Sequence, residues 1–198
     1  MLGSTAERVI HASACPVAVV PRGYERPPSG VRLIGAAFSD TPEGRDALAF
    51  AVALARAGRA RVRAITVLDS AHAVEQSHGM LSEQHHDVGP EQAAASTGRL
   101  GAEAALHSAV GDLGAAVDVE LDVLVNQPAD GLVAASRTLD LLVMGSRALG
   151  PRKAVVLGSV SRKVVDQAGC PVLVLPRGAG EMRDALLANA ATHVPPAG

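Results

Sequence analysis

The sequence predicts an α/β protein built on a doubly wound, five-stranded parallel sheet, with an extra helix and strand at its N-terminus. Two observations predict this fold. Short apolar runs bounded by turn residues alternate with longer segments that carry helix signals, in the order βαβαβαβαβ. A helix-and-strand pattern near the N-terminus also repeats the last part of that array. Alternating strands and helices of this kind bury a parallel sheet between two helical layers.

The alternating array takes up residues 32–175. Strands are expected at 32–38, 61–68, 117–125, 141–144 and 172–175. Helices are expected at 41–58, 91–113, 128–138 and 159–167, two of them with a proline near the start. The polar stretch 69–90 is expected to be a loop, and 181–191 a loose helix at most.

Composition excludes several classes of protein. The chain has 198 residues, 48% hydrophobic and 19% charged, enough for a sizeable core in one domain with extensions. A net charge of −2 and three aromatic residues argue against binding to nucleic acid. No apolar run is long enough for a membrane span, the N-terminus does not resemble a secretion signal, and two cysteines fit a reducing compartment. We therefore expect a cytoplasmic protein without membrane contact.

The repeat defines the expected domains. Residues 2–23 and 157–178 align without gaps, and 11 of the 22 positions are identical, including the pairs GS and the triplets CPV and PRG. We therefore expect the chain to open with the last helix and strand of one domain (1–23), followed by a linker (24–30), a complete second domain (31–178) and a flexible tail (179–198).

Two segments are suited to a phosphate site. FSDTPEG (38–44) follows the first strand of the complete domain, and GSRALG (145–150) follows the fourth. Gly158 and Ser159 then open a helix, where free N–H groups favour an anion, while Arg147, Arg152 and Lys153 add positive charge. In the alternative interpretation these glycines only form turns and the basic side chains are solvated.

Other chemistry has little support in the sequence. The histidines of the 69–90 loop lack the spacing of a metal site, so a solvated loop is the better interpretation; they are His72, His78, His85 and His86. There is no nucleophile elbow and no P-loop. Cys15 and Cys170 precede prolines at strand starts and are expected to be buried structural thiols. We therefore expect no enzyme.

The segment VMGSRALGPRKAVVLGSVSRKVVDQAGCPVLVLPRG (143–178) resembles the C-terminal signature of the universal stress protein family. That family's nucleotide motif is Gly, two residues, Gly, nine residues, then Gly-Ser or Gly-Thr. The resemblance covers roughly 31–178 and implies a five-stranded parallel sheet of order 3-2-1-4-5. It further implies an adenine nucleotide ligand, ATP with or without Mg²⁺, in some members, and a homodimer in many. The N-terminal repeat resembles the tail of the first unit of a tandem member.

Site residues follow from this resemblance position by position. The nucleotide-binding residues it implies are Ala37, Phe38, Ser39, Val67, Met144, Gly145, Arg147, Ala148, Gly150, Gly158, Ser159 and Val160. Two positions depart from the family pattern: Ala148 stands at the second glycine, and Ser39 stands where ATP-binding members carry an aspartate. Asp40 is adjacent, but a one-residue shift is expected to aim its side chain elsewhere.

Three functions remain open from the sequence. The leading one is a nucleotide-binding regulatory module of the stress response, with weak or no hydrolysis. The second is an interaction or dimerisation module of the same fold with a decayed pocket, which Ser39 and Ala148 favour. The third, an adenylate-handling enzyme, would need a Ser-Gly-Gly-x-Asp-Ser loop that FSDTPEG does not supply.

The N-terminal segment carries its own expectations. Residues 17–20 should add as an antiparallel edge strand beside 172–175 and cover the edge that would otherwise form a homodimer. Cys15 and Cys170 would then lie far apart and form no disulfide. Ser4 and Glu7 form a capping box for the preceding helix, which should be frayed, with Val9 and Ile10 poorly buried.

Overall fold

The computed structural model describes residues 8, 10, 13–69, 90–114, 117–146, 155 and 157–180. Predictions that concern Ser4, Glu7, Val9, the four loop histidines or the tail lie outside these residues. The strands are β1 (Val17–Val19), β2 (Leu33–Ala37), β3 (Arg61–Leu68), β4 (Val119–Val125), β5 (Leu141–Gly145) and β6 (Val172–Leu175). The helices are α2 (Pro42–Gly58), α4 (Pro90–Asp112), α5 (Pro128–Ser136) and α6 (Ser159–Gln167).

All six strands form one sheet in the order β1-β6-β5-β2-β3-β4. The strands from β2 to β6 are parallel, and numbered among themselves they have the predicted order 3-2-1-4-5. β2 lies in the middle and pairs with β3 on one side and β5 on the other. The predicted α/β fold is confirmed: five parallel strands and the antiparallel β1 form a mixed sheet of six strands.

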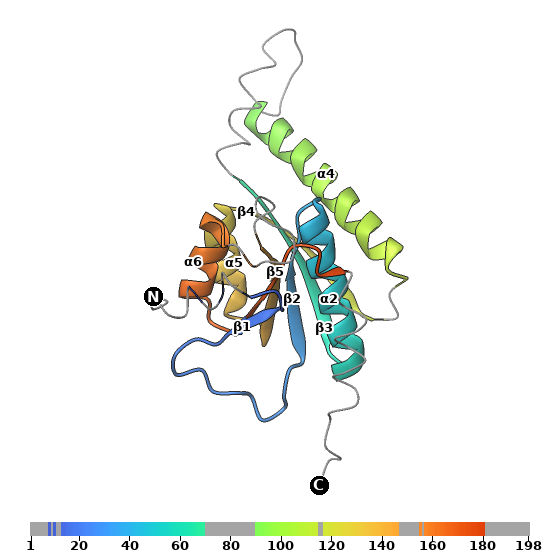
Figure 1. Cartoon of the computed structure of the whole chain (residues 1–198). Helices are drawn as coiled ribbons and strands as arrows, with labels where there is room; N and C mark the ends of the chain where they lie inside the picture. Colours follow the sequence, from blue (N-terminus) through green and yellow to red (C-terminus); the bar gives the residue numbers. More distant parts are fainter. Residues whose placement is uncertain are drawn as a thin grey trace.

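Helices cover both faces of this sheet (Figure 1). α2 and α4 pack on one face, where Ile34 and Ala36 of β2 contribute to the core. α5 and α6 pack on the other face, against side chains such as Leu142 and Met144 of β5. Neighbouring residues of a strand therefore point into different layers, as the period of two in a strand requires.

Most observed boundaries lie within two residues of the predicted ones, and local chemistry explains the differences. Thr41 is the N-cap of α2 rather than its first residue, because its Oγ1 accepts a hydrogen bond from the N–H of Gly44 (3.2 Å). α2 ends at Gly58, and the next residue, Arg59, adopts a left-handed conformation (φ 53°). β5 runs one residue further than predicted, because Gly145 still pairs with Leu175.

The N-terminal strand pairs as predicted. β1 runs antiparallel to β6, with Val17 opposite Val174 and Val19 opposite Val172. Val20, predicted to be in the strand, lies beyond its end and is 57% exposed. The edge of the parallel sheet at β6 is therefore covered by the chain's own N-terminal segment.

The prediction that Ile10 is poorly buried was wrong. Ile10 is 2% exposed and belongs to the core cluster on the α5 and α6 face. Three residues later, the carbonyl of Ser13 accepts a hydrogen bond from the N–H of Val155 (3.1 Å). Ile10 and Ser13 are thus held against the part of the chain that follows β1, whereas the sequence predicted that Ile10 had lost the sheet that would cover it.

The two cysteines have different environments, so the prediction that both are buried was wrong for one of them. Both are free thiols, as expected from the antiparallel pairing, but Cys15 is exposed while Cys170 is buried. Burial raises the pKa of the Cys170 thiol to about 12, and the negative charge of Asp140 adds to the shift. Cys15 lies two residues before the short edge strand β1.

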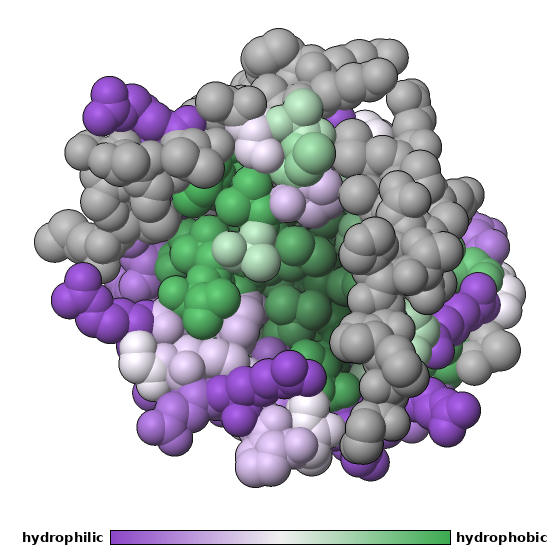
Figure 2. Space-filling view, turned by 60° about the horizontal axis from the view of Figure 1, so that its bottom comes forward, coloured by the Kyte–Doolittle hydropathy of each residue, from purple (hydrophilic) through white to green (hydrophobic). Residues whose placement is uncertain are grey.

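Hydrophobic residues also lie on the surface of the molecule. On the face seen in Figure 2, hydrophobic residues gather in the middle and hydrophilic residues lie around much of the margin. In the described part of the chain, none of the helices is long and apolar enough to cross a membrane.

Removing residues 1–23 should increase self-association. The deletion uncovers the edge of β6, whose backbone groups can then pair with another chain. Sedimentation velocity over a range of concentrations should show a discrete dimer that the full chain does not form. A deleted chain that keeps its circular dichroism spectrum and stays monomeric at every concentration would contradict this prediction.

The two thiols should react at very different rates. The thiolate is the reactive form, and a pKa of about 12 keeps Cys170 protonated at pH 8. A colorimetric thiol reagent should therefore modify one thiol of the native protein rapidly and the second only after unfolding. The Cys15→Ser variant should lose the rapid phase, and two rapid phases in the native wild-type protein would show that Cys170 is accessible.

Candidate functional site

A cavity of about 610 Å³ lies beyond the carboxyl ends of β2, β3 and β5. β2 is followed in the chain by α2 on one face of the sheet, whereas its neighbour β5 is followed by α6 on the other face. In open α/β sheets, ligands bind in the crevice that forms at this point. The cavity is lined by Ala37, Phe38, Ser39, Thr41, Glu43, Gly44, Ile65, Val67, Pro128, Leu132, Met144, Gly145, Ser146, Gly158, Ser159, Val160 and Ser161.

Three helices begin at the cavity. Residues from the first turn of α2, α5 and α6 all line it. The first N–H groups of a helix have no partner within the helix, and together with the helix dipole they favour negative charge. In α6 the Ser161 hydroxyl accepts the N–H of Gly158 (3.1 Å), which fixes the start of the helix beside Ser159. The geometry therefore favours an anionic group at this edge.

The start of α2 lies unusually close to the ends of β2 and β5. A Cβ atom at Gly145 would lie only 2.8 Å from the carbonyl oxygen of Glu43. A Cβ at Gly44 would meet the backbone and hydroxyl of Ser39 at distances below 3 Å. Only glycine permits either approach, so these two positions bring the first turn of α2 against β5 and form one wall of the cavity.

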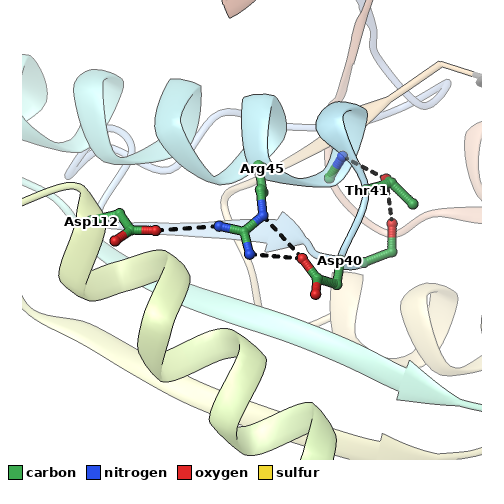
Figure 3. A network of polar contacts seen from close by, with 6 residues as sticks. Asp40, Thr41, Arg45 and Asp112 are labelled. Carbon is green, nitrogen blue, oxygen red and sulfur yellow. Dashed lines mark hydrogen bonds and ion pairs between the residues drawn. The ribbon is translucent and has the colours of Figure 1, made fainter.

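The turn from β2 to α2 is fixed by a network of polar contacts (Figure 3). The hydroxyls of Ser39 and Thr41 are 3.1 Å apart and share a hydrogen bond. Arg45 lies between Asp40 (2.8 Å) and Asp112 at the end of α4 (3.3 Å) and pairs with both. Asp40 is thereby held outside the cavity lining, as its one-residue shift predicts, and does not replace the carboxylate that Ser39 lacks.

The described lining is mostly apolar and carries one charged residue, Glu43. The Glu43 side chain is 12% exposed, and its Oε1 lies 3.4 Å from Nε of Arg177, just beyond β6. Ser146, next to the glycine that ends β5, is 5% exposed, and among the described residues its hydroxyl has no hydrogen-bond partner. A buried hydroxyl without a hydrogen-bond partner lowers the stability of the fold. Such groups therefore call for an explanation, and a functional role is one such explanation.

The structure brings together the predicted site residues that it describes. Nine of them line this cavity: Ala37, Phe38, Ser39, Val67, Met144, Gly145, Gly158, Ser159 and Val160. Arg147, Ala148 and Gly150, with the basic residues Arg152 and Lys153, lie outside the described part of the chain. The nine described residues share one cavity, which agrees with a binding site. The role of these residues toward a nucleotide stays a prediction.

The residue-by-residue prediction omitted other lining residues: Glu43 and Ser146, which lie within the two segments expected to suit phosphate, and Pro128 and Leu132, which lie outside them. The first turns that follow β2 and β4 could have been included, because helices that follow parallel strands begin at the same edge of the sheet. Nothing in the spacing showed that Glu43 contacts Gly145. Within the described residues, no group of three or more His, Cys, Asp or Glu side chains is placed to hold a metal ion.

A model of the universal stress protein family matches residues 30–176, about three quarters of the chain. The chain belongs to the universal stress protein family. A curated relative is the universal stress protein in the QAH/OAS sulfhydrylase 3′ region of Thermus aquaticus, with 44% identity over 55 residues. That match covers 27% of this chain and 40% of the relative, so it spans less than half of either protein.

Solved structures of universal stress proteins share the fold. UspA of Lactobacillus plantarum superposes with a TM-score of 0.56 at 18% identity, over 77% of this chain and 99% of that protein. A universal stress protein solved in complex with cAMP gives a TM-score of 0.53 at 20% identity, over 75% and 98%. One from Archaeoglobus fulgidus gives 0.56 at 21% identity and covers 90% of this chain but only 57% of its own length. At these identities the likeness shows the fold.

Two buried serines should respond oppositely to removal of the hydroxyl. Ser136→Ala loses hydrogen bonds to the Val133 carbonyl (2.7 Å) and the Gly169 N–H (2.9 Å), so it should destabilise the protein by about 1–3 kcal/mol. Ser146→Ala removes a hydroxyl without a partner and should leave the free energy of unfolding unchanged or raise it by up to about 1 kcal/mol. Urea unfolding measures both, and an equal loss in the two variants would show that Ser146 has a structural bond.

Proposed function

We propose that this chain is an ATP-binding regulatory domain with slow or no hydrolysis. The observation that carries the proposal is the convergence of nine residues implied by the family's nucleotide motif on one cavity at the carboxyl ends of β2, β3 and β5. Among the described lining residues, none is a nucleophile paired with a general base, which supports binding without efficient chemistry.

The cavity suits an adenine nucleotide in size and chemistry. Its volume of about 610 Å³ falls in the usual range of small-molecule sites, roughly 300–1,000 Å³. Apolar side chains such as Ile65, Val67 and Met144 offer a surface for the flat base. The first turn of α6, beginning at Ser159, offers backbone N–H groups to the phosphates, to which Mg²⁺ could be bound. The lining thus combines apolar side chains for the base with a helix start that favours negative charge.

The departures at Ser39 and Ala148 imply a weak site. A lost hydrogen bond to the nucleoside costs roughly 0.5–1.5 kcal/mol. Alanine at a strained glycine position costs about 1 kcal/mol more. Together they lower affinity on the order of ten- to a hundredfold. We therefore expect weak binding. The site would still be occupied wherever the ATP concentration is high, as it is in a cell.

A second function has support from one observation. The Ser39 hydroxyl is bonded to Thr41 rather than free for a ligand, as expected if the pocket has decayed and the domain acts through contacts with a partner or a second copy. A calorimetric titration with ATP and magnesium separates the two functions. Heat of binding that saturates supports the nucleotide site, and none at millimolar ATP supports the interaction module.

Restoring the family pattern should tighten ATP binding. In the double variant Ser39→Asp with Ala148→Gly, a carboxylate returns to the nucleoside side and a glycine to the phosphate loop, so Kd should fall about ten- to a hundredfold. The matched control Ser39→Asn with Ala148→Gly lacks the charge and should gain less. A double variant that binds no better than the parent would show that this crevice is not the nucleotide site.

Gly145→Ala should abolish binding while leaving the sheet intact. The new methyl group would contact the backbone of Glu43 at 2.8 Å, so the start of α2 must move at the wall of the cavity. Gly58→Ala is the control, since a Cβ there meets nothing within 4 Å. Calorimetry should show no ATP binding for Gly145→Ala and normal binding for Gly58→Ala, and equal binding in both variants would contradict the assignment of this wall.

A further inference from the structure

The pair formed by Glu43 and Arg177 joins two elements that are distant in the sequence. Glu43 is in the first turn of α2, and Arg177 is two residues past the end of β6. Their charged groups are 3.4 Å apart, with the Glu43 side chain 12% exposed and the Arg177 side chain 37% exposed. At this depth the interaction is screened less than that of a surface pair.

Glu43 is also the lining residue placed against Gly145. Its carbonyl oxygen and Cβ would lie within 3 Å of a Cβ at that glycine. If the proposed function is right, Gly145 borders the phosphates, and a carboxylate then lies close to the most negative part of the ligand. A nearby negative charge disfavours an anionic ligand, and a cation paired with it offsets that effect. The described lining itself holds no basic residue that could do so.

We propose that the Glu43–Arg177 ion pair sets the charge selectivity of the cavity, with Glu43 disfavouring polyphosphate ligands and Arg177 offsetting it. The inference rests on the proposed function and extends it to a residue pair outside the family's nucleotide motif. The affinity for an uncharged nucleoside such as adenosine should not depend on the pair. The affinity for ATP should be lowered by Glu43 and raised by Arg177.

The pair can be tested by changing one charge at a time. Calorimetric Kd values for ATP and for adenosine are measured in EDTA with the wild-type chain, Glu43→Gln, Arg177→Gln and the double variant. Glu43→Gln should tighten ATP binding and Arg177→Gln should weaken it, each on the order of three- to tenfold. Adenosine binding should stay within about twofold in both variants, because it carries no charge for the pair to act on. The double variant should bind ATP nearly as the wild type does, and 0.5 M salt should shrink all of these differences.

A purely structural ion pair gives a different pattern. Both single variants would then break the same contact and change ATP and adenosine affinity in the same direction, which would overturn the inference. The conservative variant Arg177→Lys, which keeps the charge, must retain wild-type ATP binding, and ligand-free thermal unfolding shows that each variant is folded. If the wild-type chain binds neither ligand, the proposed function fails together with this inference. If it binds both but the ratio of their affinities is the same in all variants, the inference alone fails.

Discussion

The pairing of β2 with a parallel strand on each side is the constraint on which the rest of the molecule depends. The chain leaves β2 and enters α2 on one face, while the α5 and α6 layer covers the other face. The layers separate where the strands end, and the cavity lies there. At the opposite end, the Asp140 carboxylate accepts the N–H groups of Arg32 and Leu33, both at 2.8 Å, and so holds the start of β2 against β5. β2 and β5 are thus held together at one end, and the cavity lies at the other end.

Small residues decide how narrow that opening is. Without side chains at Gly44 and Gly145, the first turn of α2 can lie against the end of β5. The same approach places Glu43 beside the glycine, with its carboxylate paired to Arg177, which follows β6, the strand next to β5. Close packing and charge balance at this wall are therefore linked, because the glycine that lets α2 approach β5 also brings Glu43 close.

Much of the fold could be predicted from the sequence because its signals are local. The apolar runs gave the strands, prolines and Gly58 marked helix ends, and the repeated CPV segment predicted the antiparallel partner of β6. The burial of Ile10 and the exposure of Cys15 could not be predicted, since each depends on which distant surface the N-terminal segment contacts. The repeated strand segment forms a strand again, as β1, but the burial of Ile10 and Cys15 follows from the surfaces that lie next to them.

The candidate site shows the same division. The glycine motif and the strand ends were visible as patterns, and the described members converge on one cavity. Glu43 and Ser146 had no pattern of their own, because their place depends on a close backbone approach and on the pairing of β5 with β6.

The strand β6 connects the covered edge of the sheet to the cavity. On one side it pairs with β1, and on the other its last carbonyl, that of Leu175, accepts the N–H of Ser146 (2.9 Å) in the cavity wall. Two residues later, Arg177 reaches Glu43 in the same wall. Contiguity alone does not establish energetic coupling between two sites. It does mean that the edge covered by β1 and the wall of the cavity share the four-residue strand β6. A displacement of either one along the sheet would therefore move groups of the other.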